Sequence, residues 1–586
     1  MNNNLRNNRS WLNRAGAVVG VVLLSGLQAF GVTATGIKRP EPGETVEVLV
    51  QYATQPTKEQ HRRVTDRNGR IRAAFSHVPV AHYDVTPEAL ADLEVNPDVV
   101  SINPNLPVSA NLDHAMANAN VNPLTSHYVS IGRSKAYGIG IAIIDSGIDM
   151  SHPDLAYFAT ANSRVVYNQS FVPTDSYSGD DYGHGTHVAG IAAGADNVAY
   201  FLGHDPRWFE GVAQDASLIN LKVLDSQGNG QDSNVIAAID AAISLKSKYN
   251  IRVINLSLGR PVTTSYKTDP LCQAVEAAWK AGIVVVVAAG NDGRDNSHGT
   301  QGYATITAPG NDPYAITVGA SNDKAGLVRA NDVIATYSSK GPTAIDHIVK
   351  PDLVAPGNRV VSYQAVPSTL PMEYPANLIP ISAYDPGALS IASPYFLTLS
   401  GTSMATPVVS GVAAMLIDQN NAITPDQVKA KLMQSAWRGF PATMSTAVTN
   451  PDGSTTTYTA NHDIFTIGAG QVDAWAAYNS TGVPTGTAAS PSAMLGSNGA
   501  VQLDLNSTSS ASVVWGTGSS FAASVVWGTN VNGASVVWGT SVVWGTGTLA
   551  GSSVIWGTSA IWGSSTPTGA KTDAAETSQI LINGEN

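Results

Sequence analysis

Three polar residues stand where an α/β protein could carry out nucleophilic chemistry. Asp145 directly follows the apolar run 141–144, so its carboxylate is expected at the carboxyl end of a buried strand, where open α/β sheets place their crevices. His184 lies between two glycines, which let the backbone come close to a cleft. Ser403 falls at the predicted start of an apolar helix, whose N-terminus favours negative charge near the hydroxyl. Where such groups converge, the alcohol can lose its proton and attack an amide.

Each of these residues also has a simpler explanation when taken alone. An aspartate after a strand often caps a loop, and a serine or threonine before a helix often caps that helix, as Ser400 or Thr402 could do equally well. His184 and His187 are three residues apart and could share a metal ion. No glutamate lies between these histidines and no third ligand is evident nearby, so a zinc site is not expected.

Asn291 is a fourth candidate. It follows the strand-like apolar run 284–288 and lies in the turn 290–293. Its amide would be a good donor to an oxyanion that develops in a transition state. A turn-forming asparagine is the alternative explanation.

Alternating strands and helices are predicted to position these residues. Strands are expected at 140–144, 218–223, 251–256, 283–288 and 315–318, and several are apolar throughout, as parallel strands covered on both faces are. Helices are expected at 234–249, 269–281 and 404–419; Pro407 is tolerated only in a first turn, which places the start of the last helix. This alternation predicts an α/β fold with a doubly wound, mostly parallel sheet and helices on both faces.

The order Asp145, His184, Ser403, each within its own extended motif, resembles the subtilisin-like serine proteases, the subtilase or peptidase S8 family. The resemblance covers residues from about 137 to 478. Between the main motifs, three shorter ones stand in family order, at 257–259, 338–342 and 350–357. A chance match of this many long motifs in one order is not expected.

The resemblance implies a role for each candidate. Ser403 is the nucleophile, His184 takes its proton and later gives it to the leaving amine, and Asp145 orients the imidazole. Asn291 and the backbone N–H of Ser403 form the oxyanion hole. The walls of the S1 pocket, which receives the side chain before the cleaved bond (P1), are Ser257, Leu258, Gly259, Ala288, Ala289 and Gly290. No carboxylate is evident at the base of this pocket, so a broad, apolar-leaning P1 preference is expected.

The N-terminal part has a small α+β pattern of its own. Its elements are expected at 45–50 (strand), 58–75 (helix), 86–95 (helix, capped by Thr86) and 99–102 (strand). It resembles the inhibitory, I9-like propeptide of the same family, an intramolecular chaperone and inhibitor, and a generic α+β module is the alternative. The resemblance implies a zymogen that cuts itself between about 105 and 120.

The first 34 residues have the features of an export signal. Arg6, Arg9 and Arg14 precede an apolar stretch, and small residues at 32–34 suit a signal peptidase. An uncleaved membrane anchor is the alternative, but glycines at several positions weaken the stretch as a span. We therefore expect a secreted protein, extracellular or at the cell surface.

Composition limits the partners and the redox chemistry. A net charge of −12 argues against a nucleic-acid partner, which would require a basic surface. The single cysteine, Cys272, excludes an intramolecular disulfide and is expected to be a buried structural thiol. The expected chemistry needs no cofactor. Asp154 matches a calcium-ligand aspartate of the family, so a structural calcium ion is a further expectation.

The C-terminal part differs in character. The unit Ser-Val-Val-Trp-Gly-Thr recurs through 512–564, which predicts stacked β-prone strands, with a disordered tail as the alternative. These repeats suggest an alternative function, surface attachment or self-association with the protease domain accessory or idle. Deletion of 505–586 is expected to leave peptidase activity intact. The predicted organisation is signal peptide 1–34, propeptide 35–110, catalytic domain 111–480, Ser/Thr/Gly/Pro-rich linker 481–511, repeats 512–564 and polar tail 565–586.

Overall fold

The computed structural model describes residues 37–504 and 580–585, apart from 38, 77, 105–106, 111–117, 131–134, 158–161, 174, 196–209, 298–299, 325–328, 381–393, 450–453, 483–485 and 496–500. The predicted signal peptide at 1–34 and the repeats at 512–564 lie outside the described residues. Within the described ranges, no helix combines the length and the apolar character that a bilayer crossing requires.

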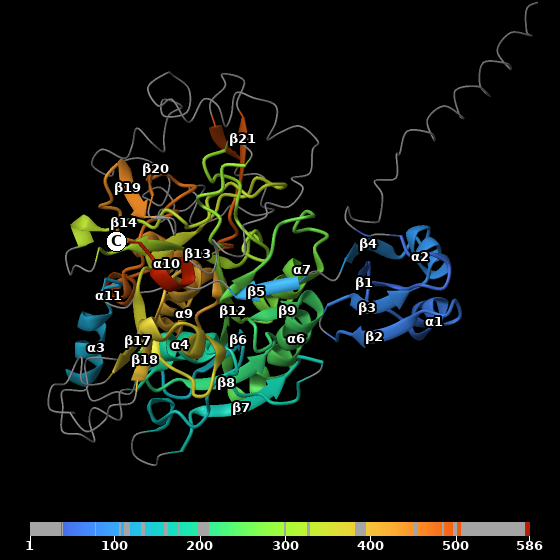
Figure 1. Ribbon diagram of the computed structural model, residues 1–586, viewed down its shortest axis with the longest axis horizontal. Helices are drawn as coiled ribbons and strands as arrows, with labels where there is room; N and C mark the ends of the chain where they lie inside the picture. The colour runs from blue at the N-terminus through green and yellow to red at the C-terminus, as the bar shows by residue number, and fades with distance from the viewer. Residues whose placement is uncertain are drawn as a thin grey trace, which may run out of the picture.

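A mostly parallel sheet forms the centre of the molecule (Figure 1). Its strands are β6 (Gly140–Asp145), β7 (Val165–Ser170), β8 (Ser217–Lys222), β10 (Ile251–Leu256), β12 (Val284–Ala288), β13 (Ile316–Asn322), β14 (Val333–Ile334) and β15 (Leu353–Pro356). Their order is β14-β13-β12-β10-β6-β8-β7, and β15 pairs with β13. Among the described residues of this sheet, every pair of neighbouring strands is parallel except β13 and β14, which are antiparallel. The five predicted strands correspond to β6, β8, β10, β12 and β13.

Helices cover both faces of this sheet, as the alternation of elements predicts. On one face α4 (His184–Ala193) packs against α9 (Thr402–Gln419), and on the other α6 (Asp232–Tyr249) packs against α7 (Pro270–Lys280) (Figure 1). Residues of β6, β8 and β12 are therefore buried along the whole of each strand.

The winding of the sheet changes direction between β6 and β10. After β6 the chain adds β7 and β8 on one side, and it then adds β10, β12 and β13 on the other. At such a switch point the loops that follow the strands diverge and leave a crevice. Asp145 ends β6, Ser257 follows β10 and Asn291 comes shortly after β12, so one edge of the sheet collects three of the predicted site residues.

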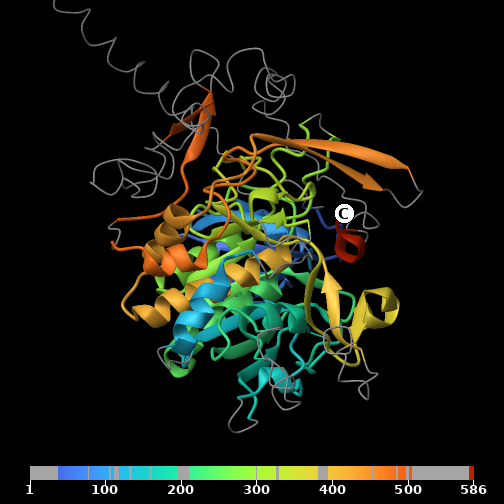
Figure 2. The same ribbon diagram turned by 90° about the vertical axis from the view of Figure 1, so that its left-hand side faces the viewer.

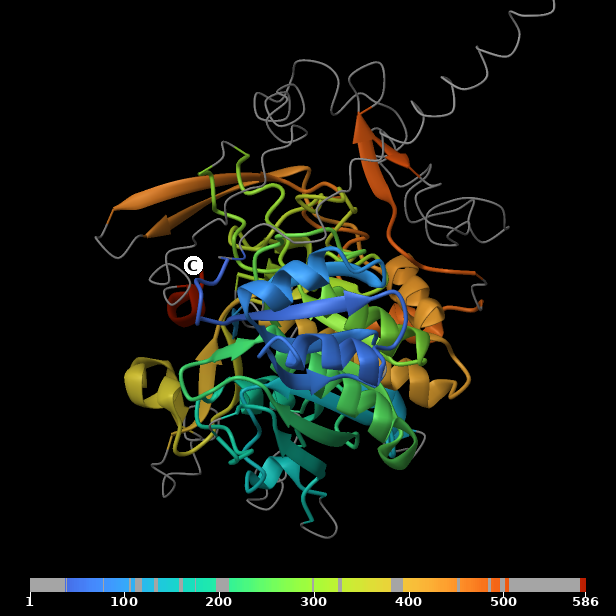
Figure 3. The same cartoon turned by 90° about the vertical axis from the view of Figure 1, so that its right-hand side faces the viewer.

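The N-terminal residues form a smaller α+β unit (Figure 3). Its antiparallel sheet has the order β2-β3-β1-β4. The elements are β1 (Val46–Tyr52), α1 (Lys58–Thr65), β2 (Arg70–Ala74), β3 (Val80–Val85), α2 (Pro87–Glu94) and β4 (Val99–Pro104). The helix predicted over 58–75 is wrong in its second half, because the chain turns at Gly69, where an added Cβ would lie 2.5 Å from Val64 Cγ1, and returns as β2. Thr86 caps α2, as predicted, by accepting from the Ala89 N–H at 3.2 Å.

In this small sheet the middle strands β1 and β3 are buried on both faces, whereas the edge strand β2 is mostly exposed. Val48 belongs to the core that the unit forms with its own helices, whereas Leu49 belongs to the core of the large domain. Ser101 Oγ and Asn103 Nδ2 donate to the carbonyl of Thr268, before α7, at 2.8 and 3.0 Å. The unit therefore lies against the face of the large domain formed by α6 and α7, as Figure 3 shows.

One further strand connects the small unit to the large domain. β5 (Pro107–Ala110) lies between β9 (Asn229–Gln231) and β11 (Leu258–Gly259) and runs antiparallel to both. Ala110 is paired with Leu258 and Ser109 with Gly259. The chain that follows the small unit thus enters the region predicted to bind substrate.

The remaining elements surround this frame (Figure 2). They are α3 (Val121–Ser130), β16 (Val360–Tyr363), α8 (Thr369–Glu373), β17 (Leu378–Pro380), β18 (Pro394–Leu399), α10 (Pro425–Ser435), β19 (Thr443–Thr449), β20 (Thr455–Asn461), α11 (Ala474–Asn479), β21 (Ser492–Leu495) and β22 (Val501–Asp504). The hairpin β21–β22 lies within 481–511, so that stretch is not purely the predicted linker; Ser490 before it is fully buried and donates to Asp352 at 2.5 Å. The predicted polar tail 565–586 also differs, because Ile580 and Leu581 are buried.

Candidate active site

Asp145 and His184 form a buried pair at the carboxyl edge of the sheet. His184 Nδ1 lies 2.5 Å from Asp145 Oδ1, and neither side chain is exposed. The strand β6 ends at Asp145 and the helix α4 begins at His184, so two rigid elements hold the two groups. The N–H of Ser146 donates to the same carboxylate oxygen at 2.7 Å. A carboxylate at Nδ1 leaves Nε2 as the ring atom that can exchange a proton with a nucleophile.

Asp180 holds the turn that leads into α4 and His184, and it is not among the residues predicted for the site. Its buried carboxylate accepts from the N–H groups of Gly183 and Thr186 at 2.7 and 2.8 Å, and from Ser146 Oγ at 2.8 Å. Burial raises the pKa of Asp180, and these donors oppose the rise. The contacts tie the end of β6 to the start of α4. No pattern in the sequence separates this aspartate from an ordinary loop residue.

Ser403 lies in the first turn of α9 and is fully buried. Its Oγ donates to the carbonyl of Ser257 at 3.2 Å. The helix that begins at His184 packs along the helix that carries Ser403, so both approach the same edge of the sheet. The prediction that Pro407 lies in the first turn is wrong, because α9 begins at Thr402 and the proline lies inside it.

Pro407 explains a second contact between Ser403 and Ser257. Pro407 has no N–H for the carbonyl of Ser403, four residues earlier. Ser257 Oγ instead donates to that carbonyl at 2.7 Å. The helix can therefore contain a proline near the nucleophile without leaving a buried carbonyl unpaired.

Asn291 is positioned through its amide oxygen. Oδ1 accepts from the N–H of Thr402 at 3.0 Å and from Thr402 Oγ1 at 3.1 Å. Thr402 Oγ1 also accepts from the Gly290 N–H at 3.1 Å. With its oxygen held on one side, the amide directs its NH₂ to the other, where it can donate to an oxyanion beside Ser403. Thr402, which the sequence shows only as a candidate cap, is the positioning residue for this donor.

The residues predicted to line S1 come from neighbouring strands. Ser257, Leu258 and Gly259 follow β10, and Ala288, Ala289 and Gly290 stand at the end of β12. Thr307 lies between the two segments: a Cβ added to Gly259 would come within 2.5 Å of Thr307 Oγ1, and one added to Gly290 within 2.7 Å of Thr307 Cγ2. Thr307 is a neutral residue that sequence patterns do not single out, and it lies between the two segments predicted to form the walls.

Two other titratable groups have structural surroundings. His187 is fully buried with Nε2 2.9 Å from the Leu397 carbonyl, and burial lowers its pKa to about 3. Among the described residues, no group of three or more His, Cys, Asp or Glu side chains could hold a metal ion. Cys272 donates from Sγ to Asn311 Oδ1 at 3.3 Å, and burial raises the pKa of its thiol, which confirms the expected structural role.

Asp154, the predicted calcium ligand, lies away from the pair of Asp145 and His184. It contacts the far end of α4, where its carbonyl accepts from the Ala195 N–H at 2.9 Å and from the buried guanidinium of Arg164 at 2.9 Å. Residues 196–209 lie outside the described residues, and calcium binding at Asp154 stays a prediction.

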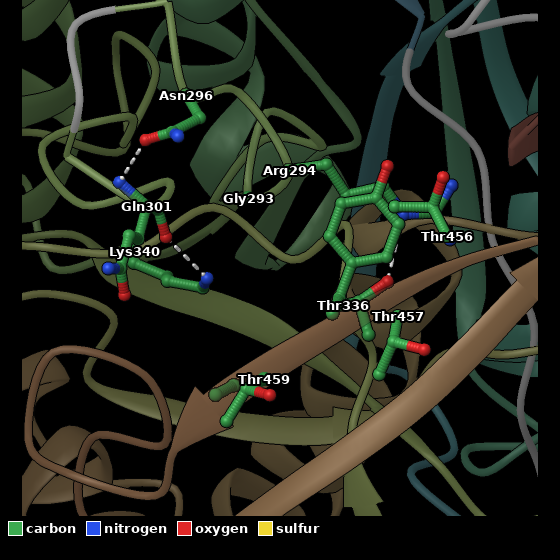
Figure 4. A pocket seen from close by; sticks show the side chains of 11 residues that line it. Gly293, Arg294, Asn296, Gln301, Thr336, Lys340, Thr456, Thr457 and Thr459 are labelled. Atoms are coloured by element: carbon green, nitrogen blue, oxygen red, sulfur yellow. Dashed lines mark hydrogen bonds between the residues drawn. The ribbon is translucent and has the colours of Figure 1, made fainter. Parts of the chain in front are cut away.

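A cavity of about 310 Å³ begins at Gly293 and Arg294, just after Asn291 in the chain (Figure 4). Arg294 and Thr336 line one wall, and threonines of β20 line another. Lys340 Nζ donates to the Gln301 carbonyl at 2.8 Å, and burial lowers the pKa of this lysine to about 8. None of the residues predicted for catalysis or for S1 lines this cavity.

Comparison with known proteins agrees with this geometry. Residues 136–470 match the subtilase family, Peptidase S8. The serine protease AprX of Bacillus subtilis is 33% identical over 377 residues, which cover 63% of this chain and 76% of that protein. Subtilisin E of the same organism is 33% identical over 379 residues, covering 64% and 79%.

The structural comparison supports the fold alone. The crystal structure of fervidolysin from Fervidobacterium pennivorans, a keratinolytic enzyme related to subtilisin, matches with a TM-score of 0.55 at 19% identity. The match covers 77% of this chain and 63% of that chain. The family match begins before β6 and ends before α11, so it contains the whole central sheet together with the elements that carry Asp145, His184 and Ser403. The chain belongs to the subtilase family and is a subtilisin-like serine endopeptidase.

Proposed function

We propose that Ser403, His184 and Asp145 carry out peptide hydrolysis through an acyl-enzyme. Ser403 Oγ attacks the peptide carbonyl carbon while His184 Nε2 takes the hydroxyl proton. His184 then gives this proton to the leaving amine as the C–N bond breaks. Water repeats the sequence on the ester, with His184 again as base, and releases the acid and the free serine. The observation that carries this proposal is the 2.5 Å contact between the buried side chains of His184 and Asp145. The helix that begins at His184, α4, also packs along α9, which carries Ser403.

Asn291 and the N–H of Ser403 are proposed to stabilise the oxyanion. Charge that develops on the carbonyl oxygen in the transition state is bound by donors fixed in advance, which costs no reorganisation during the reaction. The two bonds from Thr402 to Asn291 Oδ1 supply that fixation on the amide side.

We further propose that the chain is made as a zymogen with the N-terminal unit as its I9-like inhibitor. The support is β5, which follows that unit and pairs with Leu258 and Gly259, the predicted S1 wall. An extended peptide added to a strand in this way mimics a bound substrate. The pairing of β5 with β11 ends with Ala110 opposite Leu258, the residue after Ser257, which favours self-cleavage soon after Ala110, within the range of 105–120.

The P1 preference is proposed to be broad and apolar-leaning. Thr307 between the two S1 walls carries no charge, and Gly259 and Gly290 contact it closely. A neutral pocket gives a Lys or Arg side chain no partner for its charge. Cleavage that is restricted to Lys or Arg at P1 would contradict this proposal.

Secretion is proposed from the export signal expected at 1–34. The alternative function, attachment or self-association through 512–564 with an idle catalytic domain, gains no support, because the subtilase match covers residues 136–470 and Asp145, His184 and Ser403 are all present within it. Self-association through these repeats in addition to proteolysis stays a prediction.

The test is the full chain with Ser403→Ala. Autoprocessing and casein cleavage should both be lost, by at least about 10⁴-fold, a magnitude taken from triad variants of the related subtilisin. The precursor should accumulate at full length. N-terminal sequencing of the active wild-type enzyme then locates the processing site. A Ser403→Ala chain that processes itself normally would remove the serine mechanism.

A further inference from the structure

Residues 580–585 lie against the catalytic domain, far along the chain from the elements they contact (Figures 1 and 2). We call Ile580–Glu585 the docked segment. Ile580 is 2% exposed and Leu581 5% exposed, and both belong to the main hydrophobic core. Hydrogen bonds to its backbone carbonyls hold the segment in place. The Ser400 N–H donates to the Leu581 carbonyl at 3.0 Å, and the side-chain Nδ2 of Asn377 donates to the Ile582 carbonyl at 2.8 Å.

Glu585 is the most strongly held residue of this segment. Its carboxylate is 0% exposed and lies 2.8 Å from an Arg294 guanidinium nitrogen. The same carboxylate accepts from the Thr336 N–H at 2.8 Å and from the Thr336 hydroxyl. The side chain of Asn358 bonds both backbone groups of Glu585, accepting from its N–H and donating to its carbonyl at 2.8 Å each. A buried carboxylate with an arginine and several donors is a specific ion-binding arrangement.

Gly584 makes the site selective for sequence. Its φ is +60°, and an added Cβ would lie 2.5 Å from Ser400 Oγ and 2.8 Å from Asn358 Oδ1. Any other residue would meet both a strained backbone and these polar atoms. The site therefore recognises apolar residues followed by Asn-Gly-Glu, which is a peptide of defined sequence and charge.

The docked segment contacts both loops of the catalytic centre. Ser400, which bonds Leu581, lies three residues before Ser403, and Arg294, which pairs with Glu585, lies three residues after Asn291. The same six-residue peptide thus connects the loop that carries the nucleophile with the loop that carries the oxyanion donor. Loss of these contacts would leave Arg294 as a buried charge without its carboxylate partner.

We propose that the docked segment is an intramolecular ligand of a dedicated peptide site on the catalytic domain, and that its binding positions the loops of Ser403 and Asn291 for catalysis. The ligand class is a peptide in which apolar residues at 580–582 are followed by Asn-Gly-Glu. This site is separate from the substrate cleft, where β5 pairs with β11. Full activity then requires a segment more than 170 residues after the nucleophile in the chain.

Docking changes the expectation for the C-terminal part. A truncation at 505 removes the docked segment together with the repeats, so it should reduce activity. Deletion of 512–564 alone retains Ile580–Glu585 and should leave kcat unchanged. Comparison of these two deletions separates any role of the repeats from that of the docked segment.

The direct test compares the wild-type chain with three variants of it, one deletion and two substitutions, in the cleavage of a chromogenic peptide. Deletion of 580–586 and the substitutions Glu585→Gln and Gly584→Ala should each lower kcat at least tenfold with KM changed less than twofold. Glu576→Gln, which removes the same charge upstream of the docked segment, is the matched control and should behave as wild type. If the deletion fails to fold, the two substitutions still test the proposal. Unchanged kcat in these variants, even with a lower Tm, would overturn the positioning role.

A binding experiment tests the site itself. A synthetic peptide of residues 578–586 should bind the Ser403→Ala chain that lacks 580–586, and it should restore kcat when added to the active chain with that deletion. The same peptide with Glu585→Gln should bind at least tenfold more weakly. The intact Ser403→Ala chain should not bind the peptide, because its own segment occupies the site. Equal binding to intact and deleted chains, no binding to either, or a dimer formed by exchanged segments would contradict the intramolecular site.

Discussion

Ser403 and Ser257 exchange two hydrogen bonds, each hydroxyl donating to the other residue's carbonyl, at 3.2 Å from Ser403 and 2.7 Å from Ser257. The bond from Ser257 satisfies the Ser403 carbonyl, to which Pro407 has no N–H to donate. Ser257 also precedes Leu258, which pairs with β5. The S1 wall, the nucleophile and the proline of α9 are therefore one connected unit.

The first prediction concerns this exchange. Ser257→Ala should lower the free energy of unfolding by about 1–3 kcal/mol, because the buried Ser403 carbonyl loses its donor. Pro407→Ala restores an N–H in the helix, so Ser257→Ala should cost much less in that background. Thermal unfolding of the four chains, all carrying Ser403→Ala to prevent autolysis, gives the coupling energy. Strictly additive effects of the two substitutions would contradict the explanation.

The second prediction concerns the oxyanion donor. Asn291→Leu should lower kcat by about 10² to 10³ with little change in KM, a magnitude known from subtilisin, a relative of this enzyme. Thr402→Val removes one of the two bonds that hold the amide and should cause a smaller loss in kcat. Steady-state kinetics on a short peptide measures both. A rise in KM with kcat unchanged would show that Asn291 only binds the ground state.

The third prediction concerns Thr307. Thr307→Asp places a carboxylate between the S1 walls and should raise kcat/KM for a Lys P1 substrate at least about tenfold, while kcat/KM for Leu at P1 falls. Thr307→Asn is the neutral control of similar size and should not favour Lys. A peptide series that differs only at P1 measures the change. No shift in preference with either variant would place Thr307 outside the pocket.

The fourth prediction concerns pH. Burial lowers the pKa of His187 to about 3, whereas an unfolded histidine titrates near about 6.5. Below that pH the unfolded chain binds a proton that the folded chain does not, so the stability falls as the pH falls. The expected loss from this residue between pH 8 and pH 5 is about 2 kcal/mol.

A matched variant isolates this contribution. His187→Gln keeps a donor for the Leu397 carbonyl and does not titrate, so its unfolding free energy should fall by about 2 kcal/mol less between pH 8 and pH 5. Urea unfolding of both chains in the Ser403→Ala background at the two pH values gives the difference. An identical pH dependence would show that His187 is not a source of acid sensitivity.

The candidate catalytic residues could be singled out in the sequence because each lies in a local pattern with a local cause. Asp145 follows an apolar run typical of a buried strand, His184 follows Gly183, and Ser403 comes two residues after Gly401, the last two at the starts of apolar helices. The order of such elements predicts which edge of a parallel sheet they reach. The residues that support them carry no such pattern. Asp180 joins the turn before α4 to Ser146, 34 residues earlier, and Thr307 lies between two segments that are distant from it in the chain, so both depend on the folded structure.

Local sequence determined the central strands and the main helices and pointed to the candidate reacting groups, because strand and helix periodicity and glycine turns act over a few residues. Tertiary structure decided the rest. Packing, not the first-turn rule, set the position of Pro407 in α9, since Ser257 supplies the missing donor. Docking turned 580–585 from an expected polar tail into a buried segment, because Arg294 and Asn358 lie hundreds of residues from Glu585 and meet it only in the folded chain.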